Sequence, residues 1–220
     1  MQKNLWCLNQ VNLFQGLPCE RLEEVEGYFS VRHLGRGDTV YQACEDGKVY
    51  LIKTGKVEVY IITPEGQKYI IDILGPGSIF GNLGLECDDE TFVETLEETT
   101  VCAADKEVFL ALISEEPTVA RRLLVNLFDK VLAVERKAAS YATDNVLQRF
   151  VKLMLSLGRA NGSAEKLVTD RYTHEQLSHM LGVSRQTITT LINDLEREGK
   201  LERNQKRLVF KKQELQSMAN

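Results

Sequence analysis

The sequence predicts an α+β protein with three successive parts: an N-terminal β-roll of the jelly-roll type, a long helix, and a C-terminal winged helix-turn-helix. Three observations lead to this fold class. Nine of the fifteen glycines lie between residues 35 and 84, where they separate short segments of alternating polarity. A heptad pattern of apolar residues begins at residue 120, and a helix–glycine–helix pattern begins at residue 173. The expected domains are a β-roll over residues 1–116, a dimerisation helix and hinge over residues 117–142, and a winged-helix domain over residues 143–220.

Composition argues against export and membrane insertion. Hydrophobic residues make up 43% of the chain and charged residues 27%, which is ordinary for a protein with a packed core. No apolar run approaches the roughly 18 residues that cross a bilayer. The first residues, MQKNLWCLNQVNLFQ, lack the basic-then-apolar order of a secretory signal. We therefore expect a cytoplasmic protein with no membrane partner.

Charge is distributed unevenly along the chain. Residues 1–106 carry nine Lys/Arg and eighteen Asp/Glu, whereas residues 107–220 carry eighteen and fourteen. The basic excess is densest over residues 197–212, where seven Lys/Arg face two Glu. Because clustered cations attract phosphates, the C-terminal part favours nucleic acid as a partner.

The N-terminal half predicts a short helix over residues 19–29, followed by a small antiparallel roll over residues 30–105. Glycine, proline and aspartate separate the expected strands. These strands include residues 47–52, 55–60 and 68–73. In the last of them, the alternation places Tyr69, Ile71 and Ile73 on one face.

A long helix is expected from Pro117, because the missing N–H of proline costs nothing in a first turn. Its apolar residues recur at spacings of four and three, which is typical of a helix–helix seam. The seam residues are Ala120, Leu124, Leu127, Val131, Val134 and Ala138. Beside them lies a second stripe, formed by Leu123, Phe128 and Leu132.

Two interpretations of this helix are open. The helix packs only on its own domain, or the second stripe packs on the roll and the seam meets a second copy of the chain. We favour the second arrangement, because an isolated helix between two domains has few other ways to bury both stripes. It predicts a homodimer interface formed by Leu124, Leu127, Val131 and Val134.

Residues 141–144 interrupt the heptads and predict a hinge near residue 142. Asp144 is expected to cap a new helix, which ends at Gly158. The expected buried residues of this helix are Val146, Leu147, Phe150, Val151, Met154 and Leu155.

Residues 173–195 read THEQLSHMLGVSRQTITTLINDL and predict a helix-turn-helix. Thr173 begins the first helix and forms a capping box with Gln176. Gly182 supplies the turn, and Ser184 caps the second helix. The expected buried residues are Leu177, Met180, Leu181, Val183, Ile188, Leu191, Ile192 and Leu195.

The second helix exposes short polar side chains and one arginine, a pattern suited to the major groove of DNA. The candidate DNA-binding residues are Ser184, Arg185, Gln186, Thr187, Thr189 and Thr190. Arg185 can make two hydrogen bonds to guanine, and Gln186 can do the same to adenine. The hydroxyls of Ser184 and Thr187, together with the helix N-terminus, suit a phosphate.

A basic two-stranded wing is expected after this helix, from residues 199–203 and 207–210 around a turn at residues 204–206. Lys206 and Arg207 are its candidate contacts to the DNA backbone. An ordinary helical hairpin is the alternative. The basic wing favours a winged helix-turn-helix that binds double-stranded DNA.

In this order, the parts resemble the cyclic-AMP receptor protein/FNR family of bacterial transcription regulators. The resemblance covers nearly the whole chain. Its most specific stretches are DGKVYLIKTGKVEVY and GPGSIFGNLGL in the roll, and LGVSRQTITTLINDLEREG in the helix-turn-helix. It implies a cyclic-nucleotide-binding-like sensor domain, a homodimer on a palindromic operator, RNA polymerase as a partner, and activation of transcription.

The resemblance also places an effector pocket at Gly81, Asn82, Leu83, Phe92 and Val93. Members that bind cyclic AMP have Glu where Asn82 stands, and Arg followed by Ser or Thr where Phe92 and Val93 stand. An anionic phosphate without its cation is costly in an apolar pocket. We therefore expect that cyclic AMP is not the effector. Leu83 stands where the carbon-monoxide-sensing haem members place a histidine, which argues against that haem mode.

The five cysteines all precede residue 103. An odd number without a secretory signal is typical of thiols in a reducing cytoplasm. FNR-type members hold an iron–sulfur cluster with three N-terminal cysteines and one after the last roll strands, the position of Cys102. The candidate redox or cluster ligands are Cys7, Cys19, Cys87 and Cys102, and Cys44 is the fifth cysteine. A cluster, a thiol-based response, haem or another small effector, and no cofactor at all are the open alternatives.

Other function classes fit less well. Residues 75–81 do not have the glycine spacing of a dinucleotide fingerprint, and His174 and His179 are not four apart as in zinc proteases. We expect no enzyme activity. A regulatory ligand-binding module would not need a recognition helix and a basic wing. An effector-independent regulator controlled by its own abundance is the remaining alternative.

Overall fold

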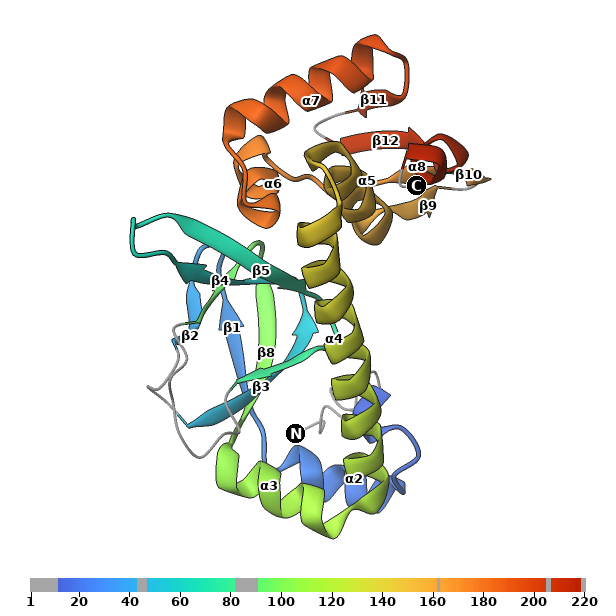
Figure 1. The fold of residues 1–220 in the computed structure, drawn as a ribbon. Helices are drawn as coiled ribbons and strands as arrows, with labels where there is room; N and C mark the ends of the chain where they lie inside the picture. The colour runs from blue at the N-terminus through green and yellow to red at the C-terminus, as the bar shows by residue number, and fades with distance from the viewer. Residues whose placement is uncertain (1–11, 43–46, 82–90, 162, 205–206, 219–220) are drawn as a thin grey trace. The chain divides into compact units, whose positions relative to one another are not determined.

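The computed structural model describes residues 12–42, 47–81, 91–161, 163–204 and 207–218. The chain divides into two compact units, residues 1–130 and 131–220. The first contains a β-roll with its covering helices, and the second contains a winged helix-turn-helix (Figure 1). The α+β class and the order of the parts are therefore as predicted.

The first unit consists of two four-stranded sheets and the helices beside them. The strand orders are β1-β8-β3-β6 and β2-β7-β4-β5, and all pairings are antiparallel. The elements are η1 (Asn12–Phe14), α2 (Cys19–Glu26), β1 (Ser30–Leu34), β2 (Thr39–Gln42), β3 (Lys48–Thr54), β4 (Val57–Ile62), β5 (Lys68–Leu74), β6 (Ile79–Gly81), β7 (Phe92–Thr95), β8 (Thr99–Asp105), α3 (Lys106–Glu115) and the first part of α4 (Pro117–Thr143).

Two apolar clusters form the core of this unit. One fills the interior of the roll, where the rings of Tyr50 and Phe80 stack with centroids 5.1 Å apart and Tyr41 meets both rings edge-on. The other joins the outside of the roll to the helices, and it includes Phe14 and Cys102. Aromatic and aliphatic side chains therefore line the described interior of the roll.

Strand β5 is present where the sequence predicts it, but its side chains do not alternate between the two faces as predicted. Ile70 and Leu74 are buried, whereas Ile71 is exposed. A bulge in the pairing of β4 with β5, between Val59 and Tyr60, shifts the register. One extra residue reverses the direction of every following side chain, so simple alternation fails across it.

Opposite the roll interior, sheet β2-β7-β4-β5 carries a group of ion pairs. The Lys68 ammonium lies 2.5 Å from Glu58 and 3.1 Å from Glu94, and 3.8 Å from the centroid of the Tyr60 ring. Burial opposes the charge on Lys68, but the two carboxylates outweigh it and raise the pKa of Lys68. The same Tyr60 ring stacks on Phe92 at 5.4 Å. These contacts tie β4, β5 and β7 together.

Two glycines have nearly the same positive φ but differ in the space that a side chain would find there. Gly55 and Gly37 have φ of +85° and +84°, but a Cβ at Gly55 would lie 2.6 Å from the Glu98 carbonyl oxygen, whereas one at Gly37 meets nothing within 4 Å. We expect Gly37→Ala to lower the free energy of unfolding by about 1–2 kcal/mol. Gly55→Ala should lower it by ~1–3 kcal/mol more, because backbone atoms must move. Denaturant unfolding checks this, and equal losses would contradict it.

Helix α4 begins at Pro117 as expected, but only its start packs on the roll. Val119 is buried in the second cluster and Leu123 packs against that cluster. Phe128 is 69% exposed and Leu132 is 43% exposed, so the prediction that the second stripe covers the roll is wrong beyond Leu123. The seam is exposed as well, with Val131 at 54%. Both stripes are therefore uncovered in a single chain.

The second unit combines three further helices of the winged-helix domain, one C-terminal helix and a four-stranded sheet. The sheet has the order β11-β12-β10-β9. The elements are α5 (Val146–Leu157), β9 (Arg159–Asn161), β10 (Ser163–Val168), α6 (His174–Leu181), α7 (Arg185–Arg197), β11 (Leu201–Asn204), β12 (Arg207–Lys211) and α8 (Lys212–Met218). The sequence analysis missed β9, β10 and α8. An Asn-Gly pair at 161–162 is a hairpin signal that could have revealed the first two.

Asn145, and not Asp144, caps helix α5. Its side chain accepts a hydrogen bond from the Gln148 backbone N–H at 3.0 Å, and the Gln148 side chain accepts one from the Asn145 N–H at 3.1 Å. Asp144 instead accepts from Lys152 at 2.6 Å and from Ser140, and these bonds lower the pKa of its carboxyl. The predicted cap was therefore wrong by one residue. Phe150, Val151 and Met154 are buried as predicted.

Candidate nucleic-acid interface

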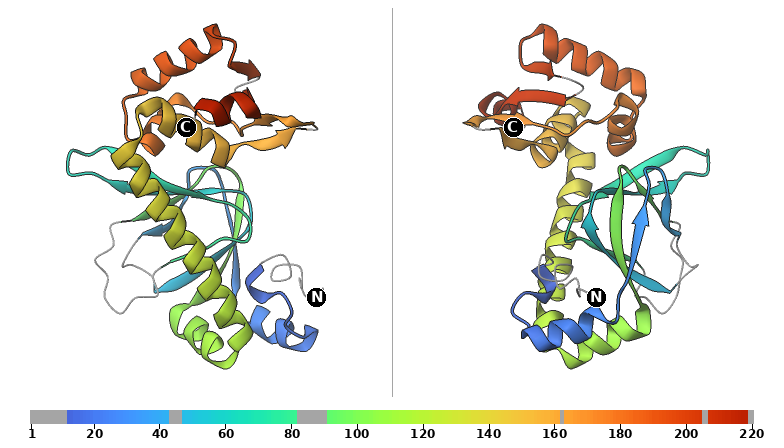
Figure 2. Two further views of the ribbon diagram at one scale, coloured as in Figure 1. Left: turned by 45° about the vertical axis from the view of Figure 1, so that its right-hand side comes forward. Right: turned by 180° about the vertical axis from the view of Figure 1, so that it is seen from behind.

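The helix-turn-helix has the geometry that the sequence predicts. Thr173 and Gln176 form a capping box at the start of α6, with hydrogen bonds of 3.0 Å and 3.1 Å. Gly182 ends α6 in the left-handed conformation, at φ 62°. Ser184 then caps α7 by accepting from the Thr187 N–H at 3.0 Å. Helices α6 and α7 contact each other and can be followed in the views of Figure 2.

The buried faces of α6 and α7 fix which side of the second helix is free. Leu177, Met180 and Leu181 are buried on α6, and Ile188, Ile192 and Leu195 are buried on α7. Leu191 and Val183 are half-buried. The opposite side of α7 is open, and the predicted residues Ser184, Arg185, Gln186, Thr187 and Thr190 are exposed there. The first turn of α7 thus presents backbone N–H groups and polar side chains together, the arrangement that binds phosphates and base edges.

Thr189 is engaged within the protein. Its hydroxyl lies 2.9 Å from Nδ1 of His174 and donates to the Arg185 carbonyl oxygen at 2.9 Å. The side chain is half-buried, unlike the five residues above. A contact from the Thr189 hydroxyl to a base would have to replace one of these bonds. Sequence reasoning missed His174, because only the packing of α6 on α7 brings it to the recognition helix.

The wing is a two-stranded antiparallel hairpin beside α7. Strands β11 and β12 pair from Leu201 with Phe210 to Asn204 with Arg207. Leu201 and Phe210 are buried, and the Phe210 ring meets Phe150 of α5 edge-on at 6.4 Å. Arg207 is exposed and pairs with Asn204 next to the turn of the hairpin. Lys206, the other predicted backbone contact, lies outside the described residues.

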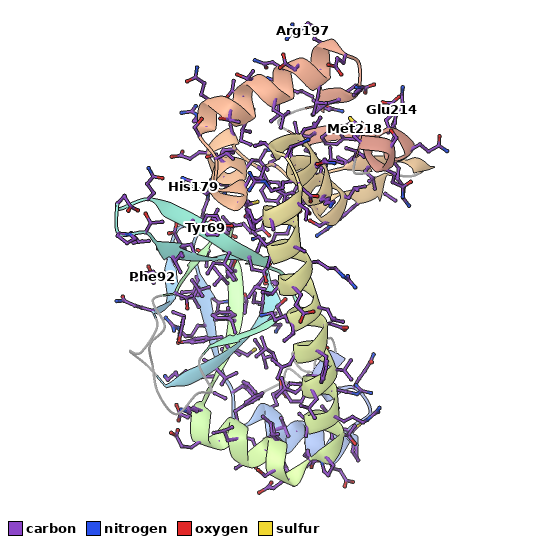
Figure 3. The ribbon with its side chains drawn as sticks, viewed as in Figure 1. Tyr69, Phe92, His179, Arg197, Glu214 and Met218 are labelled. Atoms are coloured by element: carbon purple, nitrogen blue, oxygen red, sulfur yellow. The ribbon has the colours of Figure 1, made fainter. Side chains whose placement is uncertain are left out.

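Ion pairs within the unit divide its basic residues into two groups. Lys200, Arg203 and Lys211 pair with Glu198, Glu196 and Glu214, and Arg197, labelled in Figure 3, pairs with Asp194. Over the ranges that the structure describes, neither Arg185 nor Arg207 forms an ion pair. Within the described residues, no carboxylate therefore offsets the charge of these two arginines, and their guanidinium groups can bind a phosphate or a base.

Tyr141, in the last turn of α4, links this helix to the helix-turn-helix. Its hydroxyl donates to the carbonyl oxygen of Met180, in the last turn of α6, at 3.2 Å. The guanidinium of Arg149 lies over the same ring, 4.9 Å from the centroid. One side chain of α4 thus contacts both α5 and α6.

In the roll, Phe92 and Val93 stand where members that bind cyclic AMP have their phosphate-binding residues, and the two side chains face opposite sides of the sheet. Val93 is buried in the interior cluster, whereas Phe92 stacks on Tyr60 on the other face (Figure 3). Gly81 ends β6 with φ +119°, and a side chain there would meet the backbone of Lys48 and Val49. No lysine or arginine of the described residues is fully buried in this interior. Asn82 and Leu83 lie outside the described residues.

The described cysteines lie in different environments. Cys102 on β8 is buried in the second apolar cluster, and Cys19 at the start of α2 is exposed. Across the described ranges, no three His, Cys, Asp or Glu side chains come together as a metal site. Cys7, Cys44 and Cys87 lie outside these ranges. The described donors therefore do not by themselves make the site that an iron–sulfur cluster requires.

Comparisons with known proteins agree with this organisation. The family described as "Cyclic nucleotide-binding domain" matches residues 31–116, and that described as "Crp-like helix-turn-helix domain" matches residues 148–218. No helix among the described residues is long and apolar enough to cross a membrane.

Two curated proteins are similar to this chain over most of their length. A "CRP-like cAMP-activated global transcriptional regulator" of Mycobacterium tuberculosis is 25% identical over 198 residues, 87% of this chain and 88% of that protein. The "Cyclic AMP receptor protein" of Thermus thermophilus is 27% identical over 191 residues, 85% of this chain and 86% of that protein. A solved structure of a CooA mutant from Carboxydothermus hydrogenoformans shares the fold, with a TM-score of 0.78 and 21% identity over 100% of this chain and 97% of that one.

Proposed function

The chain belongs to the cyclic-AMP receptor protein/FNR family of DNA-binding transcription regulators, and from this premise we propose that it works in the cytoplasm as a homodimeric activator on palindromic operators. One observation carries the proposal: an exposed recognition helix with an unneutralised Arg185 stands beside a basic wing. As an activator, the protein would also contact RNA polymerase. Selection of bound sequences from a random duplex library tests the proposal, since it should return a two-fold symmetric site with half-sites about one helical turn apart.

The exposed stripes of α4 support the homodimer. Leu124, Leu127, Val131 and Val134 lie on one side of the helix at heptad spacing, and all are exposed in the single chain. Apolar patches of this length mark interfaces, and a two-fold axis would bury the same residues from both copies. The domain division proposed from the sequence, 1–116, 117–142 and 143–220, assigns this helix to dimerisation. An operator with two half-sites requires such a dimer.

We also propose that cyclic AMP does not control the protein, although two relatives are named for it. Val93 lies inside the apolar roll and Phe92 lies outside it, at the positions where the family pairs a cation with the cyclic phosphate. Calorimetric titration of the protein with cyclic AMP should therefore show no saturable binding at micromolar concentration. Saturable binding coupled to tighter operator binding would contradict the proposal.

A redox or oxygen-linked input through Cys7, Cys19, Cys87 and Cys102 stays a prediction. Cys102 lies where η1 and α2 pack on the roll, so a change at this thiol would reach the contact between the roll and its helices. An absorption spectrum of protein purified without oxygen tests for a cluster or haem. Peroxide and reductant, applied to colourless protein, test for a thiol response in DNA affinity.

An effector-independent regulator is the second candidate. Its support is the described interior of the roll, where the rings of Tyr50 and Phe80 stack and Tyr41 packs edge-on against Tyr50. A regulator of this kind would be controlled by its abundance. It would bind its operator equally well when oxidised or reduced, and small ligands would leave its affinity unchanged.

A further inference from the structure

His174 is the first residue of α6, and its ring lies against the recognition helix α7. Nδ1 of His174 is 2.9 Å from Oγ1 of Thr189, and that hydroxyl is 2.9 Å from the carbonyl oxygen of Arg185. A threonine hydroxyl has a single proton, and a carbonyl oxygen can only accept one. Both contacts are hydrogen bonds at the same time only when Thr189 donates to Arg185 and Nδ1 of His174 donates to Thr189, and this is the arrangement taken here.

This chain of hydrogen bonds fixes which nitrogen of His174 titrates. The neutral ring carries its proton on Nδ1, so Nε2 is the nitrogen that gains the second proton. The bond from Nδ1 to Thr189 is present in both charge states. Protonation of His174 therefore leaves the contact to α7 unchanged and adds only a positive charge at this end of the helix.

Two guanidinium groups, one on β11 and one on α7, act on the charge of His174. Partial burial lowers the pKa of His174, and Arg203 on β11 and Arg185 on α7 lower it further. Arg203 is held towards α7 by Asn193 and by Glu196, whose carboxylate is 3.1 Å away and offsets part of its charge. At neutral pH the free protein thus holds an uncharged imidazole near two cations.

We propose that His174 takes up a proton when the protein binds DNA and then contributes a positive charge, in addition to that of Arg185, to a backbone phosphate. The inference rests on the proposed DNA-binding function. A phosphate stabilises the imidazolium, so the complex binds a proton more tightly than the free protein does. Binding therefore consumes a proton. DNA affinity is highest at low pH and falls as the pH rises from the pKa of free His174 to that of His174 in the complex.

The test measures the dissociation constant for a mixed-sequence duplex by fluorescence anisotropy, at fixed ionic strength, between about pH 5.5 and 8. Over part of this range we expect the affinity of the unchanged protein to fall by about threefold to tenfold per pH unit for each DNA-binding domain that contacts the duplex, so a dimer that engages both domains reaches at most about a hundredfold. His174→Asn keeps an N–H near Nδ1 for Thr189 but cannot titrate. It should lose this slope and keep its affinity near pH 8.

The matched controls are His33→Asn and His179→Asn, which replace the other two histidines of the chain and should keep the slope. A slope that persists in His174→Asn would overturn the inference and leave the DNA-binding function standing. Failure of the unchanged protein to bind any duplex would instead overturn the proposed function. Should His174→Asn not fold, calorimetry of the unchanged protein in buffers of different ionisation enthalpy decides the matter. Proton uptake supports the inference, and no uptake refutes it.

Discussion

Glutamate in place of both Leu127 and Val131 is expected to convert the protein into monomers that do not hold a palindromic operator. Both side chains are exposed on α4, 48% and 54%, and both belong to the proposed two-fold interface. Each carboxylate would be buried opposite its own copy, at a cost of several kcal/mol per charge. Because the substituted side chains are exposed in the single chain, its folding should be unaffected. Dimerisation should therefore weaken by more than about a thousandfold.

Sedimentation equilibrium at micromolar concentration checks this result, with far-ultraviolet circular dichroism to confirm that the monomer is folded. The matched control is Asn126→Glu with Ala133→Glu, which adds the same two charges to exposed positions of α4 away from the seam. This control should remain dimeric and bind DNA. A stable monomer of the unchanged protein at the same concentration would show that the seam is not a dimer interface.

Loss of the Arg185 side chain is expected to weaken binding to the specific operator by about 1–3 kcal/mol and binding to random DNA by much less. Arg185 is exposed in the first turn of α7, and no ion pair among the described residues neutralises it. Gln186 is expected to read an adjacent base. Removal of Arg207, or of Lys206 beyond the described residues, should weaken all DNA similarly and reduce the dependence of affinity on salt.

Competition binding with the selected operator and a scrambled duplex measures both effects at two salt concentrations. Arg197→Ala is the matched control, because Arg197 lies at the far end of α7 and pairs with Asp194. It should change neither affinity substantially. Equal losses on the two duplexes for Arg185→Ala would mean that Arg185 contacts a phosphate and that our assignment to a guanine is wrong.

The local sequence was sufficient to predict those structural features that depend only on neighbouring residues. The capping box of Thr173 with Gln176, the left-handed Gly182 and the cap at Ser184 each involve residues three apart or fewer, or a single backbone conformation. The start of α4 at Pro117 follows from the same kind of rule. For this reason the helix-turn-helix was predicted nearly residue by residue.

Predictions failed where contacts between distant segments decide the outcome. The bulge between Val59 and Tyr60 depends on how two strands pair, so the buried face of β5 could not be read from its own alternation. Both Asp144 and Asn145 have side chains that can cap α5. Lys152 on α5 binds the Asp144 carboxylate, and Asn145 caps the helix.

The sequence by itself determined the class of this protein: a roll, a long seamed helix and a winged helix-turn-helix, in an order that identifies a family of transcription regulators. Only the tertiary structure decided which side chains are available for function. It placed Val93 inside the roll and Phe92 outside, engaged Thr189 with His174, and paired Arg203 with Glu196 while leaving Arg185 unpaired among the described residues. Periodicity and caps are short-range and repeat along the chain, whereas hydrogen bonds and ion pairs between elements depend on distances that folding alone creates.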